Sequence, residues 1–214
     1  MKKIELMVFD LDGTLIDSGN DIASAVNYTL KTMSLPLLER DKITAYVGDG
    51  VKLLLERSMG DGNIGNIAEA LDIFINYYSD HMLDTTVLYP NVKDVLHHFK
   101  DKRKVIVTNK MHGLSCKIVD ELEIAGYFEE IIGRDSTPYN KPDPALLRSL
   151  VRKHSADMER TVVIGDGYND IKLAKNSNAI SCALLNGLGI RNNLLELDPD
   201  HSCEDISELK KLFY

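Results

Sequence analysis

Two aspartates lie two residues apart directly after the first apolar run of the chain. Residues 4–9 have the pattern of a buried strand, and Asp10 and Asp12 follow at once, with Gly13 and Thr14 behind them. Carboxylates gathered at the mouth of a core repel one another unless a cation lies between them or some are protonated. Gly13 lets the backbone come close to a bound ligand, which a side chain at that position would prevent.

Two later apolar runs also end in polar residues. The run that begins at Thr161 continues into Asp166 and then Asp170, and another ends in Thr108 and Asn109. In open parallel sheets, ligands bind at the carboxyl ends of the strands, so these side chains are predicted to share one site. Lys141 precedes a proline-initiated helix and is expected to reach the same edge.

The residue types indicate which ligand this site would take. Its candidate metal ligands carry oxygen only, without a nearby histidine or cysteine, which favours a hard ion such as Mg²⁺. Magnesium is commonly bound by one or two carboxylates together with a phosphate. The Thr108 hydroxyl, the backbone amides after Asn109 and the Lys141 ammonium group are donors that suit phosphoryl oxygens.

The elements that would position these residues alternate between strands and helices. Five short apolar runs predict strands, at residues 4–10, 104–109, 129–135, 161–166 and 179–185. Helical patterns occur between or after them, at residues 91–101, 113–126, 143–155, 169–177 and 204–213. Such alternation predicts an α/β fold, a doubly wound (Rossmann-like) parallel sheet covered by helices on both faces.

One long segment interrupts this alternation. Residues 15–85 contain helical patterns near residues 20–33, 39–46, 50–59 and 66–83, and no convincing strand. We therefore predict a helical cap at residues 15–85, inserted after the first strand of a catalytic core formed by residues 1–14 and 86–214.

Composition excludes several classes of partner. The 214 residues include 33 acidic and 25 basic side chains, so the formal net charge is −8, which disfavours a nucleic-acid binder. The three cysteines are widely spaced without a CxxC pair, as in a reduced chain. No apolar run approaches the length of about 18 residues that a membrane span needs. These patterns predict a cytoplasmic protein without a nucleic-acid or membrane partner, and they leave its oligomeric state open.

Four short motifs together resemble those of the haloacid dehalogenase superfamily. They are DLDGT at residues 10–14, TN at 108–109, Lys141 within KPDP, and GDGYND at 165–170, and the resemblance extends from residue 1 to about residue 184. It implies that Asp10 is a nucleophile that forms an aspartyl-phosphate and that Asp12 is the general acid and base. Magnesium would be held by Asp10, Asp166 and the backbone carbonyl of Asp12.

The same resemblance implies roles for three more residues. Asp170 would lie behind the metal ligands or bind through a water, and Thr108 and Lys141 would bind the phosphoryl group. Dehalogenase and phosphonatase members lack an acid at the position of Asp12, and P-type ATPases carry threonine there and span membranes. Among the enzyme classes of the superfamily, a phosphatase and a phosphomutase remain compatible with these residues.

Within the superfamily the chain looks most similar to phosphoglycolate phosphatases. This narrower resemblance rests on VTNK at 107–110, PYNKPDP at 138–144 and the cap segment YVGDGVKLLLERS at 46–58. The expected function is a magnesium-dependent phosphatase that hydrolyses a small phosphorylated metabolite. Lys52 and Arg57 are the cap cations nearest to that segment's glycine turn, and Lys52 is predicted to bind a substrate carboxylate.

Three alternatives remain at the level of sequence. A β-phosphoglucomutase-like enzyme would share Asp10 and Asp12, but its relatives have an arginine-containing loop where this chain has residues 48–50, which are Gly-Asp-Gly. A pyrophosphatase of the same superfamily would have a comparable cap. A phosphorylatable receiver domain, which is not an enzyme, also uses acids, threonine and lysine, but it is usually about half this length and has no helical insert.

Overall fold

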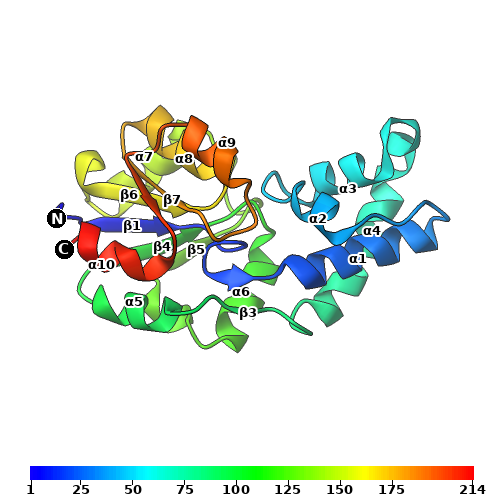
Figure 1. Ribbon diagram of the computed structural model, residues 1–214, viewed down its shortest axis with the longest axis horizontal. Coiled ribbons are helices and arrows are strands. Elements are labelled where there is room, and N and C mark those ends of the chain that lie inside the picture. The colour runs from blue at the N-terminus through cyan, green and yellow to red at the C-terminus, as the bar shows by residue number, and fades with distance from the viewer.

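The computed structural model describes residues 1–214, except for the side chains of Asp61 and Ile64. Figure 1 shows two lobes, one built around a sheet and the other entirely helical. The sheet has six parallel strands in the order β5-β4-β1-β6-β7-β8. In chain order these strands are β1 (Leu6–Phe9), β4 (Arg103–Val107), β5 (Glu130–Ile132), β6 (Thr161–Gly165), β7 (Ile180–Leu184) and β8 (His201–Cys203).

Helices cover both faces of the sheet, as the sequence predicted. Because successive side chains of a strand point to opposite faces, Met7 and Phe9 of β1 pack in one apolar cluster while Leu6 and Val8 pack in another. The first cluster includes residues of α5, α6 and α10, and the second includes residues of α7 and α8. The helices of this lobe are α5 (Val92–His98), α6 (His112–Glu121), α7 (Pro144–Lys153), α8 (Tyr168–Ser177), α9 (Arg191–Glu196) and α10 (Leu209–Leu212), with 3-10 turns η2 (Ala125–Tyr127), η3 (Met158–Arg160) and η4 (Ile206–Glu208).

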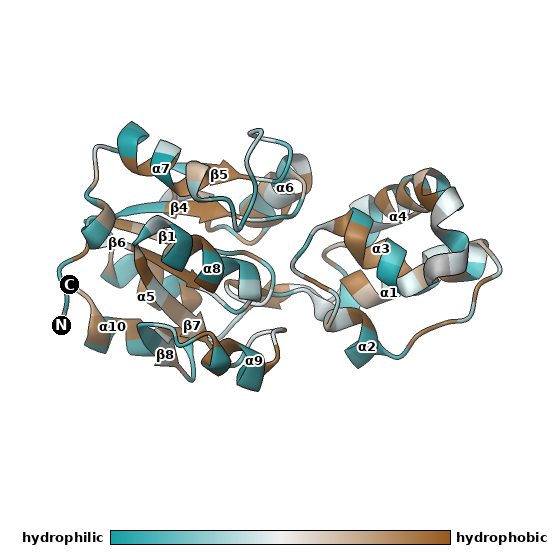
Figure 2. Cartoon of the chain, turned by 90° about the horizontal axis from the view of Figure 1, so that it is seen from above, coloured by the Kyte–Doolittle hydropathy of each residue, from teal (hydrophilic) through white to brown (hydrophobic). Residues whose placement is uncertain are grey.

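The helical lobe lies between β1 and β4 in the sequence. It consists of α1 (Gly19–Thr32), α2 (Arg40–Thr44), α3 (Val51–Met59), the 3-10 turn η1 (Asp61–Asn66) and α4 (Ile67–His81). These bounds agree closely with the four helical patterns of the sequence. Figure 2 shows apolar and polar residues on α1, α3 and α4, and the buried apolar residues of this lobe belong to the cluster that continues into the sheet lobe. We call this lobe the cap.

Two short strands lie in the connections to the cap, and the first of them falls within residues 15–85, where the sequence interpretation found no convincing strand. β2 (Ile16–Asp17) pairs antiparallel with β3 (Val87–Leu88), so the segment entering the cap and the segment leaving it lie side by side. Two residues are too few to show an alternating pattern. The pair is reinforced by the buried Asp21 carboxylate, which accepts hydrogen bonds from the backbone amides and hydroxyls of Thr85 and Thr86.

The C-terminal region also differs from the expectation of one closing helix at residues 204–213. The edge strand β8 comes first, and the predicted helix is divided into η4 and the short α10. α10 contributes Leu209 to the core, and the adjacent Phe213 is buried there as well. Among the helices of the described chain, none has the length and apolar character needed to cross a membrane.

Candidate active site

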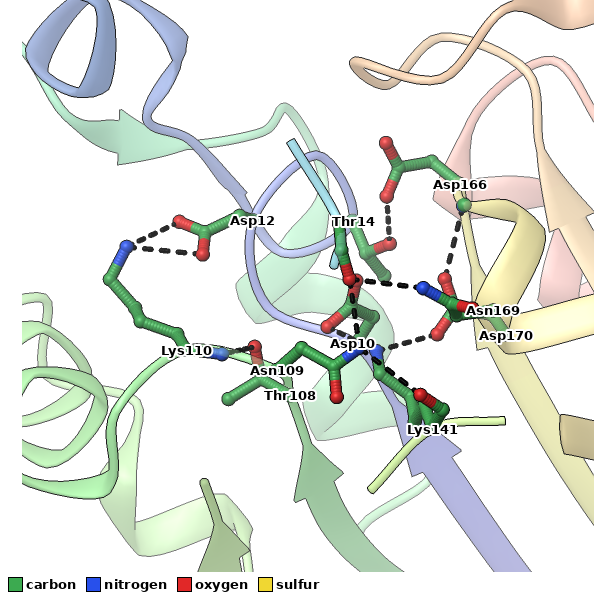
Figure 3. A network of polar contacts seen from close by, with 12 residues as sticks. Asp10, Asp12, Thr14, Thr108, Asn109, Lys110, Lys141, Asp166, Asn169 and Asp170 are labelled. Atoms are coloured by element: carbon green, nitrogen blue, oxygen red, sulfur yellow. Dashed lines mark hydrogen bonds and ion pairs between the residues drawn. The ribbon is translucent and has the colours of Figure 1, made fainter. Parts of the chain in front are cut away.

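The site lies where three adjacent strands end. β4, β1 and β6 are neighbours in the sheet, and each is followed at once by polar residues that the sequence singled out. Asp10 follows β1, Thr108 follows β4 and Asp166 follows β6. Parallel strands present their carboxyl ends at one edge. The structure therefore brings these residues together as predicted (Figure 3).

Three buried aspartates form the centre of this site. Asp10, Asp166 and Asp170 each place one carboxylate oxygen within 4.8 Å of the others. The Lys141 ammonium group lies between two of them, 2.7 Å from Oδ1 of Asp10 and 2.6 Å from Oδ1 of Asp170. Three carboxylates thus face one ammonium group, and their full ionisation would leave two negative charges without a partner.

This imbalance shifts the acid–base properties of the cluster. Burial, together with the nearby Asp170, raises the pKa of Asp10 to about 7, although Lys141 opposes the rise. Burial and the charge of Asp10 raise the pKa of Asp166 to about 6. Burial also raises the pKa of Asp170. For Lys141, burial acts to lower the pKa, but attraction to Asp10 and Asp170 outweighs it, so this side chain remains charged.

The orientation of Asp166 is fixed by hydrogen bonds and by one glycine. Thr14 Oγ1 donates to Oδ1 of Asp166 at 2.8 Å, and the backbone amides of Leu188 and Gly189 donate to Oδ2 at 2.8 and 3.1 Å. Gly13 has a φ of +84°, and a Cβ there would lie 2.0 Å from Oδ2 of Asp166. In the described structure the close neighbour of Gly13 is thus Asp166, whereas the sequence suggested a ligand.

The donor set fits a divalent cation such as magnesium. All three carboxylates supply oxygen, the atom type that Mg²⁺ prefers, and two excess negative charges match one divalent ion. Oδ1 of Asp10 is buried and, among the described side chains, accepts no hydrogen bond; Lys141 lies at ion-pair distance but not in hydrogen-bonding geometry. Beside the ammonium group of Lys141, a metal ion would give this buried oxygen a further partner.

Asp12 does not belong to the aspartate cluster, because its carboxylate is held elsewhere. Lys110 Nζ donates to its two oxygens at 2.9 and 3.1 Å, and Ser18 Oγ donates to Oδ1 at 2.6 Å. The same ammonium group donates to the hydroxyl of Tyr78 in α4 at 2.8 Å. Lys110 thereby links a core aspartate to a cap helix. Figure 3 shows Asp12 and Lys110 apart from the other carboxylates.

Thr108 and Asn109 are both buried at the end of β4. Oγ1 of Thr108 accepts a hydrogen bond from the backbone amide of Lys110 at 3.2 Å, which leaves its proton available for another acceptor. The Asn109 side chain instead donates to the cap, to the carbonyl of Gly48 at 2.8 Å. Asn169 of α8 donates to the same carbonyl at 3.2 Å, so the glycine turn of the cap rests directly on the site.

Lys52, a further candidate, lies outside the site altogether. Its side chain is 62% exposed and lies 3.8 Å from Glu56 on the same helix, and neither cavity described below has it among its described lining residues. The preceding residue, Val51, lines the apolar cavity, and consecutive residues of a helix lie on different faces. Arg57 does line a cavity, paired at 2.6 Å with Asp49.

Two cavities meet at Asp10 and Asp12. The polar cavity, about 170 Å³, is lined by the aspartate cluster, Lys141 and residues of the loops after β6 and β7. The apolar cavity, about 70 Å³, extends under the cap. Its apolar lining comes from α3, α4 and the start of α6, and includes Val51, Leu54, Phe74, Ile75, Met111 and Leu114.

Sequence reasoning gave no site role to Lys110, Tyr78, Thr14 or Asn169. Lys110 was visible as the fourth residue of VTNK, and a lysine directly after two polar residues at a strand end is a signal that could have found it. Thr14 closes the DLDGT motif, and Asn169 precedes Asp170 in GDGYND. Tyr78 has no such signal, because its helical spacing is that of a core residue.

Comparisons with known proteins agree with these motifs and this geometry. Residues 7–184 match the family model described as haloacid dehalogenase-like hydrolase. A phosphoglycolate phosphatase of Vibrio cholerae is 33% identical over 98% of this chain and 96% of its own length, and one of Aquifex aeolicus is 33% identical with the same coverage.

Solved structures agree in fold. The crystal structure of a predicted phosphoglycolate phosphatase from Haemophilus somnus superposes with a TM-score of 0.90 at 27% identity, and the match covers 99% of both chains. The four motifs that suggested the resemblance all lie within residues 7–184, the segment matched by the family model. The chain belongs to the haloacid dehalogenase-like hydrolase family.

Proposed function

We propose that the protein is a magnesium-dependent phosphatase that hydrolyses a small phosphorylated metabolite through an aspartyl-phosphate on Asp10. The observation that carries the proposal is the buried cluster of three aspartates with one lysine, in which Oδ1 of Asp10 accepts no hydrogen bond from the described side chains. The relatives named phosphoglycolate phosphatase support the reaction class and make phosphoglycolate the first ester to assay.

In the proposed reaction, a carboxylate oxygen of Asp10 attacks phosphorus and the bond to the ester oxygen breaks. Asp12 gives a proton to the departing alkoxide, so the alcohol leaves neutral. Asp12, now a carboxylate, takes a proton from a water whose oxygen attacks the same phosphorus. Orthophosphate is released and Asp10 is restored. The Asp12 side chain is not one of the three carboxylates of the cluster, so it is available for a role separate from theirs.

The remaining residues bind the metal and the phosphoryl group. Asp10, Asp166 and the backbone carbonyl of Asp12 would hold magnesium, with Asp170 behind them. The ion would supply positive charge that offsets the carboxylates and the phosphate dianion. Thr108 and Lys141 would donate to phosphoryl oxygens, together with the backbone amides after Asn109. Lys141 is well suited because buried acids on both sides keep it protonated.

The domain division and the setting of the protein are part of the same proposal. We assign the catalytic core to residues 1–14 and 86–214 and the cap to residues 15–85, on the basis that β2 and β3 pair where the chain passes between the lobes. The substrate is a small metabolite in the cytoplasm, and no nucleic acid or membrane is involved. The acidic net charge of −8 supports the exclusion of nucleic acid.

Release of orthophosphate from phosphoglycolate tests the proposal. Activity is expected with Mg²⁺, and it should vanish when a chelator is added. Calcium should inhibit, because its looser coordination does not hold the octahedral geometry that an in-line displacement needs. Full activity after removal of all metal would contradict the proposal.

The same assay separates the alternatives. A phosphomutase would convert β-glucose 1-phosphate to the 6-phosphate without releasing orthophosphate, and a pyrophosphatase would prefer inorganic pyrophosphate to every ester. A receiver-like module would accept one phosphoryl group and stop, whereas multiple turnovers are expected here. Membership of a hydrolase family supports turnover.

A further inference from the structure

We propose that the apolar cavity binds the organic part of the substrate, so that the preferred esters are phosphate monoesters of small apolar alcohols. The inference rests on the proposed phosphatase function and concerns the group that leaves from phosphorus. The cavity begins at the two carboxylates that carry the reaction, Asp10 and Asp12, and extends from them under the cap. An ester whose phosphorus faces Asp10 therefore directs its organic group into this space.

Three elements supply an apolar lining. Val51 and Leu54 come from α3, Phe74 and Ile75 from α4, and Leu114 from α6. These side chains cannot donate or accept a hydrogen bond, whereas the polar side chains that line the cavity are those of Asp10, Asp12, Tyr78, Thr108, Asn109 and Lys110. Pockets of this composition gain affinity by removing apolar surface from water, at roughly 25 cal/mol per Å². A polar organic group that faces these five apolar side chains would lose its hydrogen bonds to water without replacement there.

The charges around the cavity disfavour an anionic organic group. Lys110 is the one cation among its described lining residues. An ammonium group has three protons to donate, and the two oxygens of Asp12 and the hydroxyl of Tyr78 accept them at 2.9, 3.1 and 2.8 Å. A substrate carboxylate would find no free donor on Lys110 and would face the negative charge of Asp12.

The cavity also limits the size of the group. To hold one water molecule, a cavity needs about 10–15 Å³ that the centre of a water-sized sphere can occupy. The apolar cavity has about 70 Å³ of this volume, which is space on the order of five water molecules. An alkyl group of three or four carbons is of that size. Phosphoglycolate is small enough to bind through its phosphoryl group alone, but contact with the apolar side chains of the cavity does not increase its affinity.

The experiment compares two esters of nearly the same shape. The 2-methylpropyl ester of phosphate has two methyl groups where phosphoglycolate has two carboxylate oxygens. With Mg²⁺ present, kcat/KM for the 2-methylpropyl ester is expected to exceed that for phosphoglycolate by at least about tenfold. Along the series of methyl, ethyl, propyl and butyl phosphate, kcat/KM should rise roughly fourfold for each added methylene until the cavity is full.

A matched pair of variants locates the effect. Ile75 and Ile73 are both half-buried residues of α4, but only Ile75 is among the described residues lining the cavity. Ile75→Gln should lower kcat/KM for the 2-methylpropyl ester by about tenfold and change that for phosphoglycolate by less than about twofold. Ile73→Gln should leave both values unchanged, and circular dichroism confirms that each variant is folded.

Binding to the Asp10→Asn variant, measured by calorimetry with Mg²⁺, gives a readout that does not depend on turnover. Tighter binding of the 2-methylpropyl ester than of phosphoglycolate is expected. An enzyme that hydrolyses phosphoglycolate better, with no increase along the alkyl series, would keep the proposed function and overturn this inference. Hydrolysis of no ester at all would overturn the proposed function, and the binding comparison would then decide the ligand of the cavity by itself.

Discussion

The two cavities that meet at Asp10 are built in opposite ways. The polar cavity is lined mainly by residues at the ends of core strands, and its buried charges are held by short hydrogen bonds and ion pairs. The apolar cavity is lined mainly by cap helices and the start of α6, through contacts that have no direction. Under the proposed function, the core would determine which bond is broken, and the cap would determine which molecule carries it.

The two cavities also differ in the free-energy change expected when one of their residues is substituted. On the polar side, removing one charged group leaves others buried without a partner, so single changes should have large effects. On the apolar side, each side chain contributes a modest and additive amount of buried surface. Substitutions at the two cavities should therefore differ in size and in the property they alter.

The largest effect is expected at the polar side. Asp10→Asn should lower kcat by at least about a thousandfold, because the amide is nearly isosteric with the carboxylate but is a far poorer nucleophile. Steady-state release of orthophosphate measures it. Asp72→Asn, at an exposed position of α4, serves as the control and should retain full activity. Near wild-type turnover by a folded Asp10→Asn protein would contradict the aspartyl-phosphate mechanism.

Lys141→Met should destabilise the protein by about 3–5 kcal/mol, because the buried carboxylates of Asp10 and Asp170 lose the cation between them. The free energy of unfolding in urea, measured with a chelator present, tests this. Lys100→Met removes an exposed lysine and should change it by less than about 0.5 kcal/mol. A loss as small at Lys141 as at Lys100 would mean that the cluster stays protonated without its lysine.

Lys110→Met tests the role of the ammonium group that holds Asp12, a residue that lines both cavities. Loss of the ammonium group frees the carboxylate of Asp12, so proton delivery to the leaving group should fall by about a hundredfold. The effect should be large for alkyl phosphates and much smaller for p-nitrophenyl phosphate, whose leaving group needs no proton. Equal losses with both esters would indicate that Lys110 acts on structure alone.

The polar cavity should also make stability depend on pH. Asp10 and Asp166 have pKa values of about 7 and about 6 in the folded protein, against an ordinary value of 3.8. The folded state thus binds protons more tightly than the unfolded chain, so the metal-free protein should lose stability as pH rises from about 4 to about 7. Thermal unfolding in a chelator measures this.

Magnesium should reverse that dependence. It competes with protons for the carboxylates, so its stabilising effect should grow over the same interval of about pH 4 to 7. The midpoint temperature of thermal unfolding is measured with and without Mg²⁺ at each pH, and the difference between the two temperatures should increase as the pH rises. If the unfolding temperatures with and without Mg²⁺ differ by the same amount at every pH, a metal site at these aspartates is contradicted.

The smallest effect is expected outside both cavities. Lys52→Ala should change KM for phosphoglycolate by less than about twofold, because the exposed ammonium group lies beside Glu56. The sequence had suggested the contrary, namely that Lys52 binds a substrate carboxylate. A rise in KM that is larger for phosphoglycolate than for phenyl phosphate would restore that suggestion and place the cation within reach of the site.

The sequence allowed much of the polar side to be predicted. Asp10, Thr108 and Asp166 follow strands with strong apolar patterns, and the geometry of a parallel sheet then places them together. The doubly wound fold was predicted for the same reason. Apolar patterns that locate the strands, and the rule that parallel strands end at one edge of the sheet, are sufficient to predict this side of the site. The residue that directly follows a strand has few alternative positions.

The apolar side was not predictable in this way. Whether Phe74 or Ile75 faces a cavity or a packed core depends on how the cap meets the sheet lobe, and helical spacing is identical in both cases. Lys52 shows the same problem, since proximity to the glycine turn in sequence did not fix the direction of its side chain. The helix predicted at residues 113–126 stops at Glu121, because Glu123 adopts a φ of +57° that no glycine signalled.

The Asp21 carboxylate has a consequence for how such a chain could have arisen. By accepting hydrogen bonds from Thr85 and Thr86, it holds together the two ends of a segment more than sixty residues long. A segment whose ends meet can be inserted into a host lobe with little added loop entropy and little disturbance of its folding. Caps of different selectivity could then be exchanged between relatives at residues 17 and 86, while the strand ends that carry the reaction are inherited unchanged.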